Sequence, residues 1–246
     1  MKNFLLTLCT IGGLQLSIAS PLQAQSLTEQ QQRELSEINT MLSANPMLIN
    51  SMHQGLNNYL VQKTKKDAFL AENQDWLFNN SVHPVMGNAN AAHQIIVFTD
   101  YDCPFCKRLE PELEKLIEKY PTIQVINILV PLRQQQPAGA KTSSALLALD
   151  LWLSDKTQFG QAHQLLMKKS GLHTSESLRH ISTSTGNDAL LTASAESQQI
   201  VERNMAVFTG FGLRGTPAIM IGEQVIPGFV PYPKLLEIAE HEFSLR

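Results

Sequence analysis

Two cysteines separated by two residues are the feature of this chain best suited to chemistry. Cys103 and Cys106 lie between an apolar, strand-like run (residues 95–98) and a helix-like segment (residues 107–120). At the first turn of a helix, this spacing brings both sulfurs within disulfide distance. The unpaired N–H groups and the positive end of the helix dipole favour a thiolate on Cys103. The pattern therefore predicts a redox-active dithiol in which Cys103 attacks and Cys106 resolves the mixed disulfide.

The rest of the cysteine count separates this interpretation from two others. Half of a four-cysteine zinc site, or a structural disulfide, would show the same spacing. The chain holds three cysteines, and the third, Cys9, lies near the N-terminus. No second pair completes a zinc site, and a disulfide that closes so short a loop would stabilise the fold only weakly. We therefore expect a catalytic Cys103–Cys106 disulfide, no metal site and no cofactor.

The N-terminus has the pattern of a secretory signal peptide. Lys2 precedes an apolar stretch that runs from Phe4 to Ala19, and the small residue Ala24 follows it. Polar residues and glycines interrupt the stretch, which is too short for a membrane span. The large leucine before Cys9 argues against a lipoprotein signal. We expect residues 1–24 to be removed and the protein to be exported into an oxidising compartment.

The charge pattern gives no support for a nucleic-acid partner. The formal net charge is −3, and the basic cluster is the short run Lys63-Thr64-Lys65-Lys66. Such a run is expected on a solvated helix face rather than in a phosphate-binding patch. We expect no binding to nucleic acid.

Residues 25–80 are expected to form a helical N-terminal region, broken at Asn45-Pro46. Its apolar residues form two stripes of about two turns each, which is too short for a coiled coil: Leu35, Ile38 and Leu42, then Ile49, Met52, Leu56 and Leu60. The stripes must pack either on the main domain or on a second copy of the chain. Methionines in this region could alternatively form an adaptable client-binding surface. Residues 81–92, with proline and glycine, are expected to be a linker.

From residue 93 onward, strand-like and helix-like segments alternate. A strand (94–99), a helix (103–120) and a strand (123–130) predict a βαβ unit with parallel strands and a right-handed crossover. The dithiol then lies at the carboxyl end of the first strand, where α/β sheets place their chemistry. A helical insert at about 138–208 precedes the last elements, two strands and a helix at 218–221, 224–226 and 233–243. We expect an α/β catalytic domain over residues 93–246.

The dithiol, the helical insert and Thr216-Pro217 before an apolar strand together resemble the thioredoxin superfamily. Within it, they resemble the bacterial periplasmic disulfide oxidoreductases of the DsbA, DsbC and DsbG type. The resemblance implies a thioredoxin-like fold with an inserted helical subdomain and a periplasmic location. It also implies that Thr216 and Pro217 form a cis-proline loop that binds substrate by strand addition. The implied partners are disulfide-containing or unfolded secreted proteins and a membrane redox protein.

Several residues favour the isomerase branch of this group. Val97-Phe98-Thr99-Asp100 and Ile226-Pro227-Gly228-Phe229 resemble DsbC-type sequences, and Val97 stands where DsbA-like oxidases carry an acid. Phe105 replaces the histidine of their dithiol motif, so we expect the Cys103 pKa to be lowered, but less than in the strongest oxidases. The N-terminal region, however, lacks the β-rich domain of DsbC. It resembles the helical extensions of dimeric or trimeric DsbA-like proteins, including those of the suppressor-of-copper-sensitivity type.

The expected function is a homodimeric protein-disulfide isomerase or reductase with Cys103 and Cys106 as its catalytic residues. One alternative is a DsbA-like oxidase recharged by a quinone-linked membrane partner. Another, from a different class, is a holdase chaperone or a metal-handling binding protein. The seven histidines lack ligand spacing and are expected to have surface or satisfied polar roles. Asp102 is expected to cap the helix, whereas Asp100 could either cap it or relay a proton from Cys106.

Overall fold

The computed structural model describes residues 26–222 and 224–245, so the expected signal peptide lies outside the described residues. The chain divides into two units, Met1–Leu60 and Val61–Arg246, which are treated separately below. Among the described helices, none combines the length and the apolar character needed to cross a bilayer.

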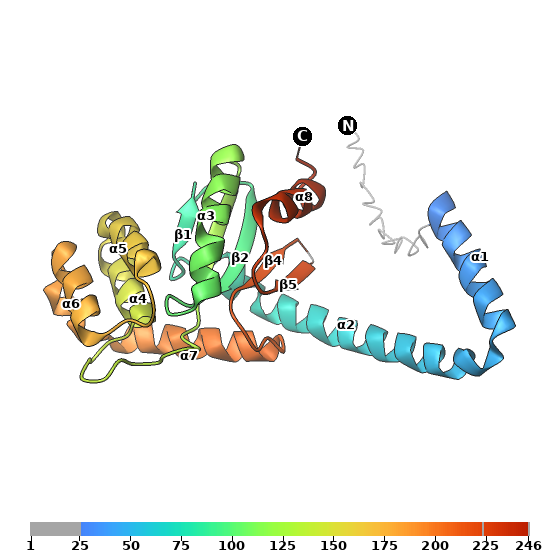
Figure 1. The fold of residues 1–246 in the computed structure, drawn as a ribbon, viewed down its shortest axis with the longest axis horizontal. Helices are drawn as coiled ribbons and strands as arrows, with labels where there is room; N and C mark the ends of the chain where they lie inside the picture. The colour runs from blue at the N-terminus through green and yellow to red at the C-terminus, as the bar shows by residue number, and fades with distance from the viewer. Residues whose placement is uncertain (1–25, 223, 246) are drawn as a thin grey trace, which may run out of the picture. The chain divides into compact units, whose positions relative to one another are not determined.

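The unit of residues 61–246 is built on a five-stranded sheet with the order β1-β3-β2-β4-β5 (Figure 1). The strands are β1 (Val85–Gly87), β2 (His93–Thr99), β3 (Ile123–Leu129), β4 (Ala218–Ile221) and β5 (Gln224–Pro227). β2 and β3 are parallel, and α3 (Pro104–Lys119) joins them, as the βαβ pattern predicts. The other neighbouring strands pair antiparallel.

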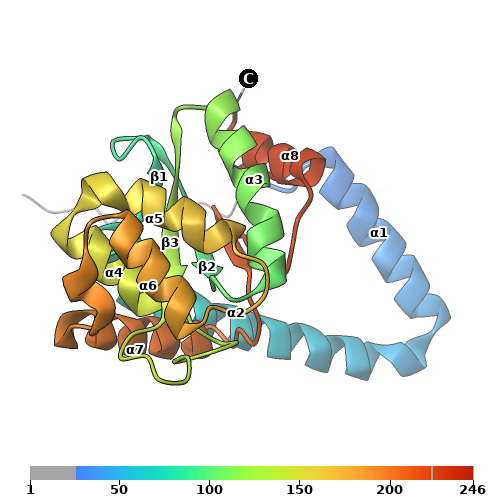
Figure 2. The ribbon, with the colours of Figure 1, turned by 60° about the vertical axis from the view of Figure 1, so that its left-hand side comes forward.

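Alternate residues of β2 point to opposite faces of the sheet, so each face has its own core. Ile95 and Val97 pack with α3 and α8 (Tyr232–Glu242), which lie side by side in Figure 2. Ile96 and Phe98 pack on the other face with α7 (Ala195–Gly210) and with the C-terminal part of α2 (Ile49–Phe78). The sheet is thus covered on both faces, and the carboxyl end of β2 leads directly to the dithiol.

The helices expected near residues 138–208 form their own core beside the sheet. They are α4 (Ser144–Ser154), α5 (Lys156–Lys168), α6 (Ser175–Ser184) and a 3₁₀ turn, η2 (Asp188–Leu191), followed by α7. Tyr101 and Leu129 enter this core from the ends of β2 and β3, and both are fully buried. The insert therefore packs directly against the loop that carries the dithiol.

The boundary before the catalytic domain differs from the expected one. Residues 85–87, inside the expected linker, form β1 and pair with β3. α2 runs unbroken to Phe78, and its Leu77 is fully buried under the sheet, while Trp76 Nε1 donates to Asn204 Oδ1 at 3.0 Å. A three-residue strand is too short to give a periodic pattern, which is why the sequence suggested a linker. Residues 61–92 thus belong to the same compact unit as the sheet.

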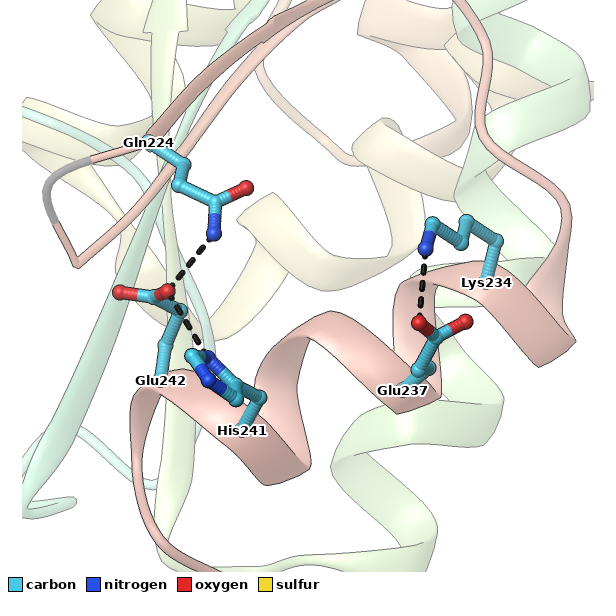
Figure 3. Close-up of polar contacts among 5 residues, drawn as sticks. All are labelled: Gln224, Lys234, Glu237, His241 and Glu242. Atoms are coloured by element: carbon cyan, nitrogen blue, oxygen red, sulfur yellow. Dashed lines mark hydrogen bonds and ion pairs between the residues drawn. The ribbon is translucent and has the colours of Figure 1, made fainter. Parts of the chain in front are cut away.

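α8 is linked to the hairpin of β4 and β5 by a hydrogen bond near its C-terminal end, beside contacts within the helix itself (Figure 3). Gln224 Nε2 donates to Glu242 Oε1 at 2.7 Å, and His241 Nδ1 lies 3.2 Å from the same oxygen. Within the helix, Lys234 and Glu237 form an ion pair at 2.8 Å. Gly222 has a φ of 57° in the turn, and a Cβ there would overlap the Glu242 carboxylate. The positive φ favours glycine at this turn, and the lack of a side chain leaves room for the Glu242 carboxylate.

The described part of the unit of residues 1–60 is helical. α1 (Glu29–Ala44) begins with a capping box between Thr28 and Gln31, and a 3₁₀ turn, η1 (Pro46–Leu48), separates it from α2, as the Asn45-Pro46 break predicts. No residue of α1 is buried. Both expected apolar stripes are largely exposed, the large exposed side chains being Leu35, Ile38, Met41, Met47, Leu48, Ile49, Met52, Leu56, Tyr59 and Leu60.

Candidate active site

The two cysteines occupy the first turn of α3, as predicted. Cys103 is the N-cap residue with an extended backbone (φ −91°, ψ 120°), and Pro104 follows at the first helical position. Cys106 lies within that first turn. Both are free thiols, and their exposed fractions are 4% and 1%.

The surroundings of Cys103 favour its thiolate. Its pKa is lowered to about 5, and the largest cause is a hydrogen bond from the Cys106 thiol. Burial opposes this effect, while the Thr216 side chain and the backbone N–H groups of Phe105 and Cys106 support it. The backbone donors at the start of α3 thus stabilise the Cys103 thiolate, as the sequence predicts for a cysteine at a helix N-terminus.

Cys106 has the opposite character. Burial is the largest cause that raises its pKa, followed by the hydrogen bond with Cys103. The Thr99 side chain and the backbone N–H of Asp100, whose nitrogen is 3.4 Å from Cys106 Sγ, lower the pKa by less. At neutral pH, the site therefore holds a Cys103 thiolate that accepts a hydrogen bond from a Cys106 thiol.

The loop at Thr216 and Pro217 lies against the dithiol. Cys103 Sγ is 3.2 Å from the Thr216 carbonyl oxygen, although 113 residues separate the two in the chain. The Thr216-Pro217 peptide bond is cis. β4 begins directly after this loop and pairs Ala218 with Phe98, which brings the loop to the carboxyl end of β2. The geometry thus joins the four residues that the sequence singled out.

Two buried aspartates flank the dithiol, and one of them differs from expectation. Asp102 does not cap α3: its carboxylate accepts from Ser144 Oγ at 2.8 Å and from the His173 N–H at 2.5 Å. Asp100 accepts from the N–H groups of Asp102 and Arg133, each at 2.8 Å. Burial nevertheless raises the Asp100 pKa to about 6. Asp102 therefore connects the loop before the dithiol to the helical insert.

A buried polar chain near the dithiol was missed at the sequence level. The Tyr101 hydroxyl lies 2.8 Å from His163 Nδ1, and His163 Nε2 lies 2.5 Å from Glu110 Oε1. Helical periodicity predicts Glu110 on the solvent side of α3, but the insert covers it. His163 has a satisfied polar role, as expected of the histidines. The sequence did hold a signal for the burial of His163. It lies four residues after Phe159, on the same face of α5, and Phe159 is a buried aromatic residue.

Lys107 makes a second connection between α3 and the insert. Its Nζ donates to the backbone oxygens of Lys169 at 2.5 Å and Gly171 at 2.9 Å. Partial burial is the main cause that lowers its pKa. The catalytic helix is therefore held to the insert through a side chain adjacent to Cys106.

Comparison with known proteins gives concordant matches. The model of the family described as Thioredoxin matches residues 79–240. Disulfide bond formation protein D of Bacillus subtilis (strain 168) is 25% identical over 179 residues, which cover 65% of this chain and 77% of that protein. A linker-deletion variant of ScsC from Proteus mirabilis is 27% identical, with a TM-score of 0.68, over 90% of this chain and 99% of the other. A periplasmic thioredoxin-like protein from Salmonella enterica serovar Typhimurium is 32% identical, with a TM-score of 0.63, and the match covers 70% of this chain and 95% of that one.

Proposed function

The chain belongs to the thioredoxin family and is a Dsb-type thiol–disulfide oxidoreductase, and on this premise we propose that it is a periplasmic disulfide isomerase or reductase. Its substrates would be misfolded secreted proteins with incorrect disulfides. The periplasmic location is supported by the relative from Salmonella enterica and by the signal-like N-terminus.

The unequal pair of cysteines is the observation that carries this proposal. The Cys103 thiolate attacks a client disulfide; a bond forms between Cys103 Sγ and one client sulfur, and the other client sulfur leaves as a thiolate. The client strand would lie against the loop of Thr216 and Pro217. Protonated Cys106 does not attack until its own proton is lost, so the mixed disulfide persists long enough to rearrange.

Two routes complete the exchange. In isomerisation, a client thiolate attacks the mixed disulfide, forms a new client disulfide and releases the Cys103 thiolate without net oxidation or reduction. In reduction, Cys106 loses its proton and attacks Cys103 Sγ, which leaves a reduced client and a Cys103–Cys106 disulfide. A membrane redox partner would then supply the two electrons that restore the dithiol.

Isomerisation and reduction are favoured over oxidation by one residue in β2 before the dithiol and one residue within it. Val97 is buried in β2 at the position where DsbA-like oxidases carry an acid, and Phe105 occupies the place of their histidine. The lowered Cys103 pKa favours the second candidate, a DsbA-like oxidase, since a stabilised thiolate stabilises the dithiol form and makes the disulfide more oxidising. The redox state in cells separates the two: mostly reduced for an isomerase, mostly oxidised for an oxidase.

Reactivation of a ribonuclease with scrambled disulfides tests the proposal directly. The full mature chain, kept reduced, is expected to restore ribonuclease activity, whereas Cys103→Ser should restore none. Cys106→Ser should retain part of the isomerisation, because that route does not need the second thiol. A chain that only oxidises reduced ribonuclease and never reactivates the scrambled form would be an oxidase.

A further inference from the structure

A groove runs beside the loop of Thr216 and Pro217, within the unit of residues 61–246. Its volume is about 450 Å³, and the apolar part of its lining is Phe211, Leu213, Pro217, Val225 and Pro227. Thr216 belongs to the lining, and its carbonyl oxygen is the one that lies 3.2 Å from Cys103 Sγ. A peptide in this groove would therefore pass next to the nucleophile.

The backbone along one wall of the groove is free to pair with such a peptide. In the part of the chain that the structure describes, the N–H groups of Arg214, Gly215 and Thr216 donate no hydrogen bond. An extended segment can add to unpaired amides of this kind as a further strand. The groove thus suits an extended peptide whose side chains alternate between the apolar lining and the rim.

Among the residues that the structure describes, the charged side chains that line the groove are all positive. Lys66 from α2 and Arg214 are the charged lining residues, and both are exposed. Asp67, the acid next to Lys66 in the chain, instead forms an ion pair with Lys63 at 2.8 Å. The chain as a whole carries a formal net charge of −3. The rim formed by Lys66 and Arg214 therefore has the opposite sign to the net charge of the protein.

A third cation lies on the neighbouring surface of the dithiol helix. Arg108 of α3 is exposed, and its guanidinium lies 4.5 Å from the centre of the Phe229 ring, next to Gly228 of the groove lining. It also lies 5.7 Å from the centre of the Phe105 ring, which is half exposed between the two cysteines. Cations therefore flank the groove from α2, from the loop before Thr216 and from α3.

The position of Lys66 is set by the packing of partly buried aromatic residues. One turn further along α2, Phe69 makes an edge-to-face contact with Phe211 at 4.9 Å between ring centres. Gly210 of α7 permits this approach, because a Cβ there would overlap the Phe69 ring. α2, which is not an element of the βαβ core, is thereby fixed so that its lysine reaches the groove.

We infer that this groove selects client segments that carry acidic residues beside the attacked cysteine, with Lys66 and Arg214 as the specificity-determining residues. The inference rests on the proposed exchange activity and names a class of substrate for it. Opposite charges on rim and client raise the rate of encounter and stabilise the docked strand, and salt screens both effects.

The test uses peptides of matched length with one cysteine, each linked by a disulfide to thionitrobenzoate, and flanked by acidic, neutral or basic residues. The full chain carrying Cys106→Ala is mixed with each peptide, and release of thionitrobenzoate reports attack by Cys103. At low ionic strength, the acidic peptide is expected to react about fivefold faster than the basic one, since each exposed ion pair contributes modestly. This ratio should fall toward one at high salt.

Charge-reversed variants locate the preference. Lys66→Glu with Arg214→Glu should invert the ratio, whereas Lys65→Glu with Arg179→Glu, which changes the net charge equally outside the groove, should retain it. Equal rates for all three peptides, or the same loss of preference in both double variants, would overturn the inference and leave the exchange activity intact. Failure of Cys103 to react with any peptide would instead refute the proposed function itself.

Discussion

At the scale of single residues, the chemistry depends on the contrast between two thiols that share one hydrogen bond. Cys103 has the lowered pKa because Cys106 donates to it, and Cys106 has the raised pKa chiefly because it is buried. The helix N-terminus adds two backbone donors on the side of Cys103. The proposed roles, attack by Cys103 and resolution by Cys106, therefore rest on the different surroundings of two residues of the same type.

The first prediction concerns the reactivity of Cys103. Its alkylation by iodoacetamide should be half-maximal at a pH of about 5, because its pKa is lowered to about 5. Cys106→Ala should shift this midpoint upward, since it removes the largest stabilising contact, yet leave it below that of a free thiol. Mass spectrometry of samples quenched at successive pH values measures the rate. A midpoint equal to that of a model thiol would contradict the described site.

The same lowered pKa predicts how stability depends on pH. The folded state of the reduced protein binds fewer protons at Cys103 than the unfolded state does between pH of about 5 and 9. The resulting stabilisation is fully present above the unfolded pKa and is lost as the pH falls through the folded one. Asp100, with its pKa raised to about 6, acts in the opposite direction at lower pH.

Urea denaturation of the reduced protein at pH values from 6 to 9 measures this effect. The free energy of unfolding of the wild type, minus that of Cys103→Ser, should rise with pH over this range. The subtraction removes contributions that both proteins share, including the main effect of burial on Asp100. A difference that stays constant or falls would show that Cys103 does not titrate as described.

A further prediction concerns Asp102. Asp102→Ala should lower the free energy of unfolding by about 1–3 kcal/mol, because the buried N–H of His173 loses its acceptor. Asp102→Asn is the matched control: its amide oxygen can accept from His173 while its NH₂ group donates to Ser144 Oγ. Denaturant unfolding should rank wild type and Asp102→Asn close together and Asp102→Ala below both. Equal losses in the two variants would indicate that the negative charge, not the acceptor, is required.

At the scale of elements, α2 has two different environments along one continuous helix. Leu77 near its end is fully buried under the sheet, whereas Leu56 is 58% exposed. Leu77→Ala should therefore lower the free energy of unfolding by about 2–5 kcal/mol, while Lys65→Ala, at an exposed position of the same helix outside the apolar stripes, should change it by less than about 0.5 kcal/mol. Chemical denaturation of both variants measures the contrast, and comparable losses would contradict the described packing.

The same burial predicts where the chain can be shortened. A chain that begins at Val61 should fold and retain a reactive dithiol, because the compact unit starts there. One that begins at Ser81 lacks Phe69, Trp76 and Leu77, which pack under the sheet, and it should aggregate or unfold. Circular dichroism and thiol titration of the two proteins decide the point. A stable fold from Ser81 onward would restore the boundary that the sequence suggested.

At the scale of the whole molecule, the exposed stripes of residues 26–60 support self-association. Apolar patches of this extent on a protein surface mark interaction sites. We therefore predict that the mature chain is a homodimer and that Ile38→Asp with Leu56→Asp makes it a monomer. Asn57→Asp, a charge change on the same helix, is the control. Size-exclusion chromatography with light scattering gives the mass in solution. A trimeric mass would support association through these stripes but contradict the predicted two subunits. A monomeric wild type would refute the prediction.

Features that depend on neighbouring residues along the chain could be predicted from the sequence. The C-x-x-C spacing identified the dithiol, and alternating and helical periods located β2, α3 and β3, since such patterns need only a few adjacent residues. Thr216-Pro217 before an apolar strand predicted, through its resemblance to thioredoxin-like proteins, a cis-proline loop that faces the dithiol. Helical periodicity likewise predicted the extent of the helical insert.

Features that depend on contacts between distant residues could not be predicted from the sequence and are seen in the fold. β1 is too short to be recognised until β3 pairs with it, and the end of α2 belongs to the catalytic unit only because the sheet covers Leu77. Asp102 and Glu110 look like solvent-facing or capping acids until the insert folds over them. Lys66 is one lysine in a basic run until packing of Phe69 against Phe211 brings it to the groove. Local patterns fix which elements form, but burial and pairing across the fold assign each polar side chain its partner.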